Sequence, residues 1–424
     1  MLEPNSVALV VLLWVSFAAA VVAVVVLWPR LARRRPLALL GRLGTQVGAS
    51  ALVVLAAAAT LNQQNGWYGT WSDLGRDLMG TPPSVQRVAV KGDLQTAGQY
   101  NASAAAEADL RAQRLFGPER AVFARDAKLH VAPGPHGQWL HVVIPGLGKA
   151  AGRGAGKAMI WLPPAYVDGP SQATYPVIEA YAGIPGSPAD YQKRMGLQNI
   201  IVRAHQKSGL IEPVVVVPDY TPSGIDTECT NSGGIDMETW LTKTVPAWTV
   251  RHLRVRPDKE SWAVMGFSAG GFCAEVSAFL HPQQYGSVML FGTYNNPSWG
   301  NWTPYGRRSI WPARYSMLNV VRQTPPPVDV WIEVSEGDRF AGPPSRSLIN
   351  AAHGRMSVTS VYLPGAGHRF DVWQAVMPVA LEWLGHAEPG FHGVIGDGVT
   401  HGTPRARSDD RVVLRGRKED ARPA

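Results

Sequence analysis

A serine in the middle of the chain carries the sharpest chemical signal in the sequence. Ser268 is the centre of the G-x-S-x-G pattern GFSAG at 266–270, between an apolar run, Trp262–Met265, and a helical stretch, Ala269–Leu280. A strand, a tight turn and a helix form the context of a nucleophile elbow, which exposes the serine oxygen at the edge of a sheet. The start of the helix adds partial positive charge near a developing oxyanion. We predict that Ser268 is a nucleophile; a plain glycine turn is the alternative.

A serine hydroxyl needs a base to remove its proton, and in this arrangement the chain order is serine, acid, histidine. His368 follows the apolar run Val358–Leu363 in the glycine-rich loop GAGH and is the predicted base. The acid must hold the imidazole in the right tautomer. Asp338 and Glu336 both follow the run Val328–Val334. We predict Asp338 as the acid, with Glu336 as the alternative.

Two backbone N–H groups are expected to form an oxyanion hole. The first belongs to Ala269, the residue after the nucleophile. The second is expected in the loop AGIPG at 182–186, which follows the run Val177–Tyr181. Pro185 has no N–H, so Ile184 is the preferred donor and Gly183 the next.

Apolar runs rich in β-branched and aromatic residues alternate with helical stretches from Gln138 onward. This alternation predicts an α/β fold with a mostly parallel central sheet flanked by helices, in a catalytic domain at 138–386. The expected strands are Trp139–Ile144, Ala158–Leu162, Val177–Tyr181, Val214–Val217, Trp262–Met265, Val288–Phe291, Val328–Val334 and Val358–Leu363. The expected helices are Pro188–Asn199, Ile235–Leu253, Ala269–Leu280, Ser345–His353 and Asp371–Leu384.

Two apolar runs at the start of the sequence are long enough to cross a bilayer, which takes about 20 residues. They predict a membrane hairpin at 1–65, with helices at about 7–28 and 43–61. A cleaved signal peptide is the alternative for the first run, but it would carry a basic segment before a shorter apolar core. A buried helix of a soluble domain is the alternative for the second run, which is alanine-rich and less apolar.

The positive charge of the chain is concentrated between these two runs. The 424 residues carry a formal net charge of +8, and residues 1–65 hold five arginines, all at 30–42, against Glu3. Positively charged loops stay in the cytoplasm. Two helices would therefore place the chain after Asn62 outside the plasma membrane, whereas a single helix would leave it in the cytoplasm. We predict a multi-pass membrane protein with an extracellular catalytic domain.

The remaining segments are less regular. Residues 66–137 are expected to form a connector or small cap, in which Ser103–Leu115 has helical composition. Residues 387–424 are rich in Gly, Arg and Asp without apolar periodicity, which predicts a flexible tail. No basic stripe with interleaved aromatic residues is present in the sequence, so we expect no nucleic-acid partner.

Residues 138–385 resemble the putative-esterase family of α/β-hydrolases, which includes esterase D and the antigen 85 mycolyltransferases. The resemblance lies in MIWLPPAY, YPVIEAYAGIPGSPADY, WAVMGFSAGGFCA, FLHPQQYGSV and GAGHRFDVWQAVMPVALEWL. The apolar N-terminal runs resemble those of membrane-anchored actinobacterial members. The resemblance implies an α/β-hydrolase fold and a serine carboxylesterase that acts on an ester or acyl-lipid through an acyl-enzyme, without a cofactor or a metal. One alternative is an acyltransferase that passes the acyl group to a sugar or glycolipid hydroxyl, and another is a non-catalytic envelope scaffold.

The two cysteines are expected to lie close together if this resemblance holds. In α/β-hydrolases the loop that would contain Cys229 passes near the nucleophile helix, which here contains Cys273. A disulfide between them would indicate an oxidising compartment; two buried free thiols are the alternative.

Overall fold

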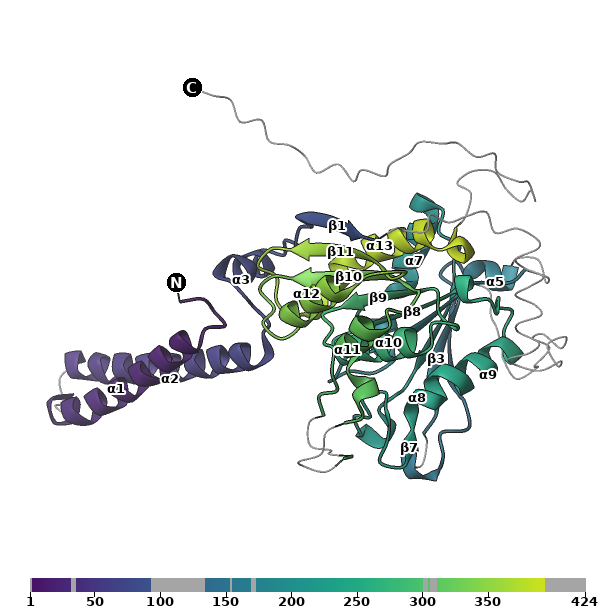
Figure 1. The fold of residues 1–424 in the computed structure, drawn as a ribbon. Coiled ribbons are helices and arrows are strands. Elements are labelled where there is room, and N and C mark those ends of the chain that lie inside the picture. Colours follow the sequence, from purple (N-terminus) through teal and green to yellow (C-terminus); the bar gives the residue numbers. More distant parts are fainter. Residues whose placement is uncertain are drawn as a thin grey trace, which may run out of the picture.

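A computed structural model describes residues 2–31, 36–92, 134–152, 155–168, 173–299, 304–305 and 311–392. Within these residues, one nine-stranded sheet forms the centre of the protein, in the order β1-β11-β10-β9-β8-β4-β5-β3-β2 (Figure 1). Its strands are β1 Arg87–Lys91, β2 Gln138–Val143, β3 Lys157–Leu162, β4 Val177–Tyr181, β5 Val214–Pro218, β8 Trp262–Phe267, β9 Ser287–Phe291, β10 Asp329–Ser335 and β11 Ser357–Leu363. A separate two-stranded hairpin is formed by β6 Asn231–Ser232 and β7 Ile235–Asp236.

The six strands from β11 to β5 are parallel, and the strands on both flanks are antiparallel. The inner strands are buried on both faces, so they read as nearly continuous apolar runs. All eight expected strands are present, and the expected α/β architecture is confirmed. The antiparallel strand β1 was not expected; it pairs with β11 and comes from the segment that the sequence indicated only as a connector or small cap.

The helices that follow β3 in the described chain cover both faces of this sheet. They are α5 Pro164–Asp168, α6 Ala189–Lys193, α7 Leu197–Ser208, α8 Met237–Thr239, α9 Val245–His252, α10 Ala269–Leu280, α11 Met317–Gln323, α12 Gly342–Ala351 and α13 Phe370–Ala387. Side chains of α7 and α13 fill one hydrophobic core, and side chains of α9, α10, α11 and α12 fill the other. The elbow helix α10 therefore packs into one core. Helix α13, which follows the loop that contains His368, packs into the other.

Two of the expected helices differ from the structure. The expected helix at 188–199 is interrupted at Gly196, which has a φ of 62° and separates α6 from α7. Glycine takes this left-handed conformation without steric cost, so the chain turns there. The expected helix at 235–253 begins two residues later, after β7, and widens into a π-helical turn at Trp240–Thr244 before α9.

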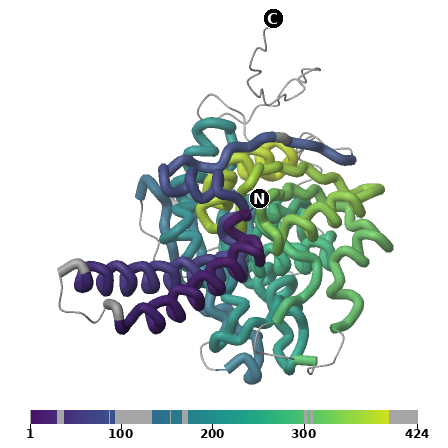
Figure 2. Tube along the Cα trace, turned by 90° about the vertical axis from the view of Figure 1, so that its left-hand side faces the viewer, coloured from purple at the N-terminus to yellow at the C-terminus, as the bar shows by residue number. Residues whose placement is uncertain are grey.

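Two antiparallel helices, α1 Val7–Leu31 and α2 Pro36–Asn65, project from one end of the sheet (Figures 1 and 2). The indole of Trp14 donates to the hydroxyl of Thr60 across the pair. The spans Val7–Pro29 and Ala38–Asn65 are apolar, and 0% and 6% of their most apolar windows are buried. Both helices are thus long and apolar enough to cross a membrane, and their apolar side chains are exposed rather than packed into a core.

The segments beside the catalytic domain are partly described. Residues 66–92 contain α3 Trp71–Leu78 and β1. Packing continues beyond the expected domain end at 386, because Phe391 is fully buried and its carbonyl accepts a hydrogen bond from the amide of Ile211. The expected helix at 103–115 and the expected tail from 393 onward lie outside the described residues.

Candidate active site

Ser268 lies in the sharp turn between β8 and α10. Its φ of 57° and ψ of −123° are strained for a residue with a side chain. The turn is tight because the neighbouring glycines touch backbone: a Cβ on Gly266 would lie 1.9 Å from the carbonyl oxygen of Gly270. A Cβ on Gly270 would in turn lie 2.1 Å from the carbonyl oxygen of Tyr181. The flanking glycines of the sequence pattern are therefore required by close packing, as a nucleophile elbow demands.

The structure brings Ser268, His368 and Asp338 into one hydrogen-bonded chain. The Nε2 atom of His368 lies 2.9 Å from Oγ of Ser268, and its Nδ1 atom lies 2.6 Å from Oδ2 of Asp338. The second oxygen, Oδ1, accepts hydrogen bonds from the amides of Phe340 and Ala341 at 2.8 and 2.9 Å. Because a carboxylate only accepts hydrogen bonds, Nδ1 carries the imidazole proton and Nε2 is left to accept the proton of Ser268.

The alternative acid is not part of this chain of contacts. Glu336 is exposed, whereas Asp338 is 2% exposed and faces the histidine. Both carboxylates lie in the same turn after β10. Their positions in the sequence therefore do not decide which one is the acid, but the directions of their side chains do. The geometry favours Asp338 as the partner of His368.

The backbone amides expected to bind an oxyanion surround Ser268. Ala269 is the first residue of α10, so its N–H has no partner within the helix. Gly183 touches the serine, since a Cβ on this glycine would lie 3.2 Å from the serine Cβ. Within the described ranges, the N–H groups of Ala269, Gly183 and Ile184 are not engaged by a backbone or side-chain acceptor. These three residues therefore remain the candidate oxyanion donors.

A cavity of about 730 Å³ opens above these groups. It is lined by Asn65, Trp67, Tyr68, Gly183, Ile184, Pro185, Arg194, Phe267, Ser268, His368, Arg369, Phe370, Asp371, Trp373 and Gln374. Aromatic side chains provide most of its apolar wall. The contributions of Asn65, Trp67 and Tyr68 are notable because these residues come from the end of the apolar hairpin.

The segment from the end of the hairpin through the first turn of α3 holds in place the loop that contains His368 and Arg369, which we call the histidine loop. We call residues 66–73 the strap. The amide of His368 donates to the carbonyl of Gly66 at 2.8 Å. A Cβ on Gly367 would lie 2.0 Å from the carbonyl oxygen of Trp67, so the two backbones are in direct contact. The acid loop has a similar contact, because Asn5, just before α1, donates to the carbonyl of Gly337 at 3.3 Å.

A buried ion pair fastens the strap to the histidine loop. The guanidinium of Arg369 donates to both oxygens of Asp73 and to the carbonyl of Trp67. The side chains of Arg369 and Asp73 are only 9% and 1% exposed. Hydrogen bonds to Asp73 and Asp371 raise the pKa of Arg369 above its usual value despite its burial. The sequence analysis missed this contact, because no spacing rule connects residues about 300 positions apart. The available signal was the pair of glycines in GWYG, which flank two aromatic residues and are compatible with a close backbone approach.

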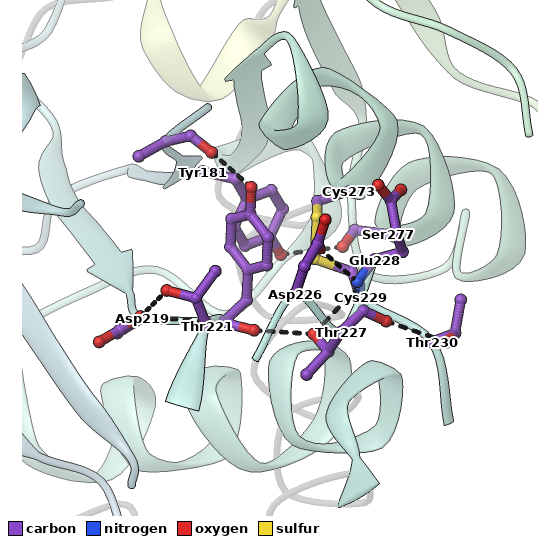
Figure 3. The surroundings of a disulfide bond; sticks show 12 residues. Tyr181, Asp219, Thr221, Asp226, Thr227, Glu228, Cys229, Thr230, Cys273 and Ser277 are labelled. Carbon is purple, nitrogen blue, oxygen red and sulfur yellow. Dashed lines mark hydrogen bonds between the residues drawn. A yellow bond between two sulfur atoms is a disulfide. The ribbon is translucent and has the colours of Figure 1, made fainter. Parts of the chain in front are cut away.

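The predicted disulfide between Cys229 and Cys273 is present, with a Cα–Cα distance of 5.3 Å (Figure 3). It joins the elbow helix α10 to the loop at 219–230, which we call the disulfide loop. The same loop supports the oxyanion side of the site, because the hydroxyl of Tyr220 donates to the carbonyl of Ala182 at 2.7 Å. Both cysteines are fully buried.

Two buried carboxyls lie beneath the site, one on each side. Burial raises the pKa of Glu333 to about 7, and the nearby charge of Asp338 adds to this shift. Burial also raises the pKa of Glu179 to about 8, although Tyr285 and Tyr181 donate hydrogen bonds to its carboxylate. Glu333 underlies the histidine side of the site, and Glu179 lies under the elbow helix.

Comparison with known proteins gives a family match over most of the catalytic domain. The family described as "Esterase: Putative esterase" matches residues 153–384. A curated protein of Corynebacterium glutamicum, described as uncharacterized, is 26% identical over an alignment of 255 residues that covers 56% of this chain and 58% of that protein. The chain thus spans less than two thirds of the length of this relative.

Solved structures with a similar fold were also found. One is a ferulic acid esterase, 16% identical, with a TM-score of 0.48, covering 58% of this chain and 97% of the other. Another is an S-formylglutathione hydrolase from Agrobacterium tumefaciens, 18% identical, with a TM-score of 0.47, covering 60% of this chain and 97% of the other.

Proposed function

The chain belongs to the putative-esterase family, and from this we propose that it is a serine carboxylic ester hydrolase in which Ser268, His368 and Asp338 act as a catalytic triad. The proposal rests on one observation above all. Oγ of Ser268, the imidazole of His368 and a buried carboxylate form a continuous hydrogen-bonded chain at the floor of a cavity.

The reaction would proceed through an acyl-enzyme. Oγ of Ser268 attacks the ester carbonyl carbon while its proton passes to Nε2 of His368. The carbonyl oxygen becomes an oxyanion and accepts hydrogen bonds from the amide of Ala269 and from Ile184 or Gly183. Asp338 holds the imidazole through Nδ1 and stabilises its positive charge.

The remaining steps return the enzyme to its starting state. The tetrahedral intermediate collapses, the C–O bond to the alcohol breaks, and the leaving alkoxide takes the proton from His368. Water then loses a proton to the same nitrogen and attacks the acyl carbon. Collapse of the second intermediate releases the carboxylic acid and returns the proton to Ser268.

We also propose that α1 and α2 anchor the protein in the plasma membrane with the catalytic domain outside. The support is the exposed apolar surface of both helices, the arginines between them and the disulfide, which persists in oxidising compartments. Alkaline phosphatase or green fluorescent protein fused after residue 72 tests the orientation. We expect phosphatase activity without fluorescence; a fluorescent fusion would place the domain in the cytoplasm.

A fluorophosphonate probe and a simple ester test the catalytic proposal. The full chain should be labelled at Ser268 and should hydrolyse p-nitrophenyl acetate. Ser268→Ala should abolish labelling and lower kcat by at least about 10⁴-fold, whereas replacing Ser347, a half-buried serine of α12 that does not line the cavity, by alanine should change neither. Folded protein that the probe does not label would refute the proposal. Product analysis with an added sugar would show whether water or a hydroxyl group accepts the acyl group.

A further inference from the structure

A second cavity lies where the hairpin meets the catalytic domain. Its volume is about 460 Å³, and its walls come from α1, α2, the strap and α3. Most of its lining is aliphatic or aromatic, and includes Leu9, Leu13, Leu55, Ala59, Trp71 and Leu74. Nothing in the hydrolysis mechanism described above uses this space.

The cavity suits an apolar ligand. The one side-chain amide in its lining belongs to Asn62, and both ends of that amide are already bonded to Tyr68: Nδ2 donates to the carbonyl, and Oδ1 accepts from the N–H at 2.8 Å. The indole of Trp71 is also engaged, donating to the carbonyl of Leu2 at 2.7 Å. Water needs several free polar partners, and the lining residues offer few.

The strap separates this cavity from the candidate active site and lines both. Trp67 and Tyr68 belong to the walls of the 460 Å³ cavity and of the 730 Å³ cavity that contains Ser268. The residue before them, Gly66, accepts the hydrogen bond from the amide of His368. The two cavities therefore adjoin at Trp67 and Tyr68, and a chain-like molecule in the hairpin cavity lies against a wall of the candidate active site.

The position of the cavity along the hairpin indicates the kind of chain. Trp67 and Trp71 are 41% and 52% exposed at the end of the apolar spans nearest the domain. Exposed tryptophans of this kind mark the boundary between hydrocarbon and head groups. At that depth a membrane lipid has its ester groups, with its acyl chains directed along the helices.

We propose that the hairpin cavity binds the acyl chain of an amphiphilic lipid ester whose carbonyl carbon lies at Ser268. This proposal rests on the serine hydrolase function proposed above and assigns its substrate class. The acyl chain lies between α1 and α2, passes Trp67 and Tyr68, and ends at the ester group above the oxyanion donors. The hairpin then has a second role beyond anchoring, because it forms part of the substrate site.

The test compares p-nitrophenyl acetate and p-nitrophenyl decanoate with the full-length protein in detergent. The measured quantity is the ratio of kcat/KM for decanoate to that for acetate. Each methylene group that enters an apolar site favours binding about fourfold, so the ratio should be well above ten in the wild type. Ala59→Phe, which fills the cavity from α2, should lower this ratio at least tenfold. Ala57→Phe, on an exposed position of the same helix, should change it less than twofold.

A second pair of variants on α1 guards against misfolding of Ala59→Phe. Leu13 lines the cavity, whereas Leu12 is exposed outside it. Leu13→Trp should lower the ratio and Leu12→Trp should not, with acetate hydrolysis reporting that each variant is folded. Equal ratios in both members of both pairs would overturn the acyl-chain site while leaving the esterase intact. A folded wild type that hydrolyses neither ester would instead overturn the proposed function itself.

Discussion

Two supports hold the candidate site from opposite sides, and they are built differently. The disulfide loop holds the nucleophile side. Cys229 is covalently bonded to Cys273 of the elbow helix, and the hydroxyl of Tyr220 donates a hydrogen bond to the carbonyl of Ala182, in the loop that contains the candidate oxyanion donors. The strap holds the base side through main-chain contacts and the buried pair of Asp73 and Arg369. One support is covalent and lies within the family-matched residues; the other is non-covalent and comes from residues before them.

The difference suggests a division of roles. The nucleophile side contains the strained serine and the elbow, which require a rigid scaffold. The base side depends on a segment attached to the apolar hairpin of α1 and α2, so we expect its geometry to be sensitive to how the hairpin and the domain fit together. We therefore expect changes to the strap to act mainly on turnover and changes to the disulfide to act mainly on stability.

The largest expected effect follows from crowding the strap against the histidine loop. In Gly367→Val the new side chain meets the carbonyl of Trp67, because even a Cβ would lie 2.0 Å from that oxygen. The loop must move, and a misplacement of about 1 Å lowers catalysis about 10²-fold, with larger losses when the base is displaced entirely. We expect kcat for p-nitrophenyl acetate to fall about 10³-fold.

The matched control is Gly75→Ala in α3, where a Cβ meets nothing within 4 Å. It should retain wild-type turnover. If Gly367→Val retained wild-type kcat, the strap would have no role in placing the base, and the two supports would not differ in the way described.

The next largest effect is a loss of stability when the disulfide on the nucleophile side is removed. Replacing both cysteines by alanine removes a cross-link between residues 44 positions apart. In the chain-entropy account this lowers the free energy of unfolding by about 4 kcal/mol. Urea denaturation measures this change, and kcat at 25 °C should remain within about threefold of the wild type. A large loss of kcat with little loss of stability would reverse the proposed division of roles.

A smaller effect is expected from weakening the strap without crowding it. Asp73→Asn removes the charge that faces Arg369 but keeps an oxygen acceptor, and Asp371 remains to pair with the guanidinium. We expect kcat to fall about tenfold with little change in KM, because the substrate cavity is kept while the histidine loop loosens. The exposed Asp236→Asn is the control. A rise in KM with kcat unchanged would assign Asp73 to substrate binding instead.

The sequence predicted the two supports unequally. The elbow, the histidine loop and the acid turn each follow a buried strand, and local apolar patterning identifies buried strands well. The parallel sheet then brings Ser268, Asp338 and His368 to one edge, so their proximity could be expected from the order of the strands. The proximity of Cys229 and Cys273 could be expected from the same fold and is confirmed.

The strap was not predictable in this way. Gly66 and His368 meet through main-chain atoms, which leave no residue-type signature, and the ion pair of Asp73 and Arg369 connects distant parts of the chain. The strand β1 was missed for a related reason: RVAVK is short, and it is stabilised by pairing with the edge of β11 rather than by its own pattern. Local periodicity reports burial within an element, whereas these features depend on long-range contacts.

The smallest expected effect is on the pH dependence of stability, to which one buried carboxyl on each side of the site contributes. The pKa of Glu333, on the base side, is raised to about 7, and that of Glu179, on the nucleophile side, to about 8. A raised carboxyl pKa means that the folded state binds more protons than the unfolded state between about pH 4.5 and the folded pKa. Stability therefore falls as the pH rises through that window, by at most about 1.4 kcal/mol per pH unit for each group.

Gln variants remove these slopes separately. The free energy of unfolding of Glu333→Gln should lose its decline between pH 5 and 7, and that of Glu179→Gln its decline between pH 5 and 8. Of the two carboxyls, only Glu333 interacts electrostatically with Asp338 and His368, so Glu333→Gln alone should shift the pH profile of kcat/KM. Urea denaturation and ester hydrolysis measured across the same pH series would separate the two. Identical shifts of the activity profile in both variants would mean that the two sides are electrostatically coupled, and the distinction between them would then be one of covalent structure alone.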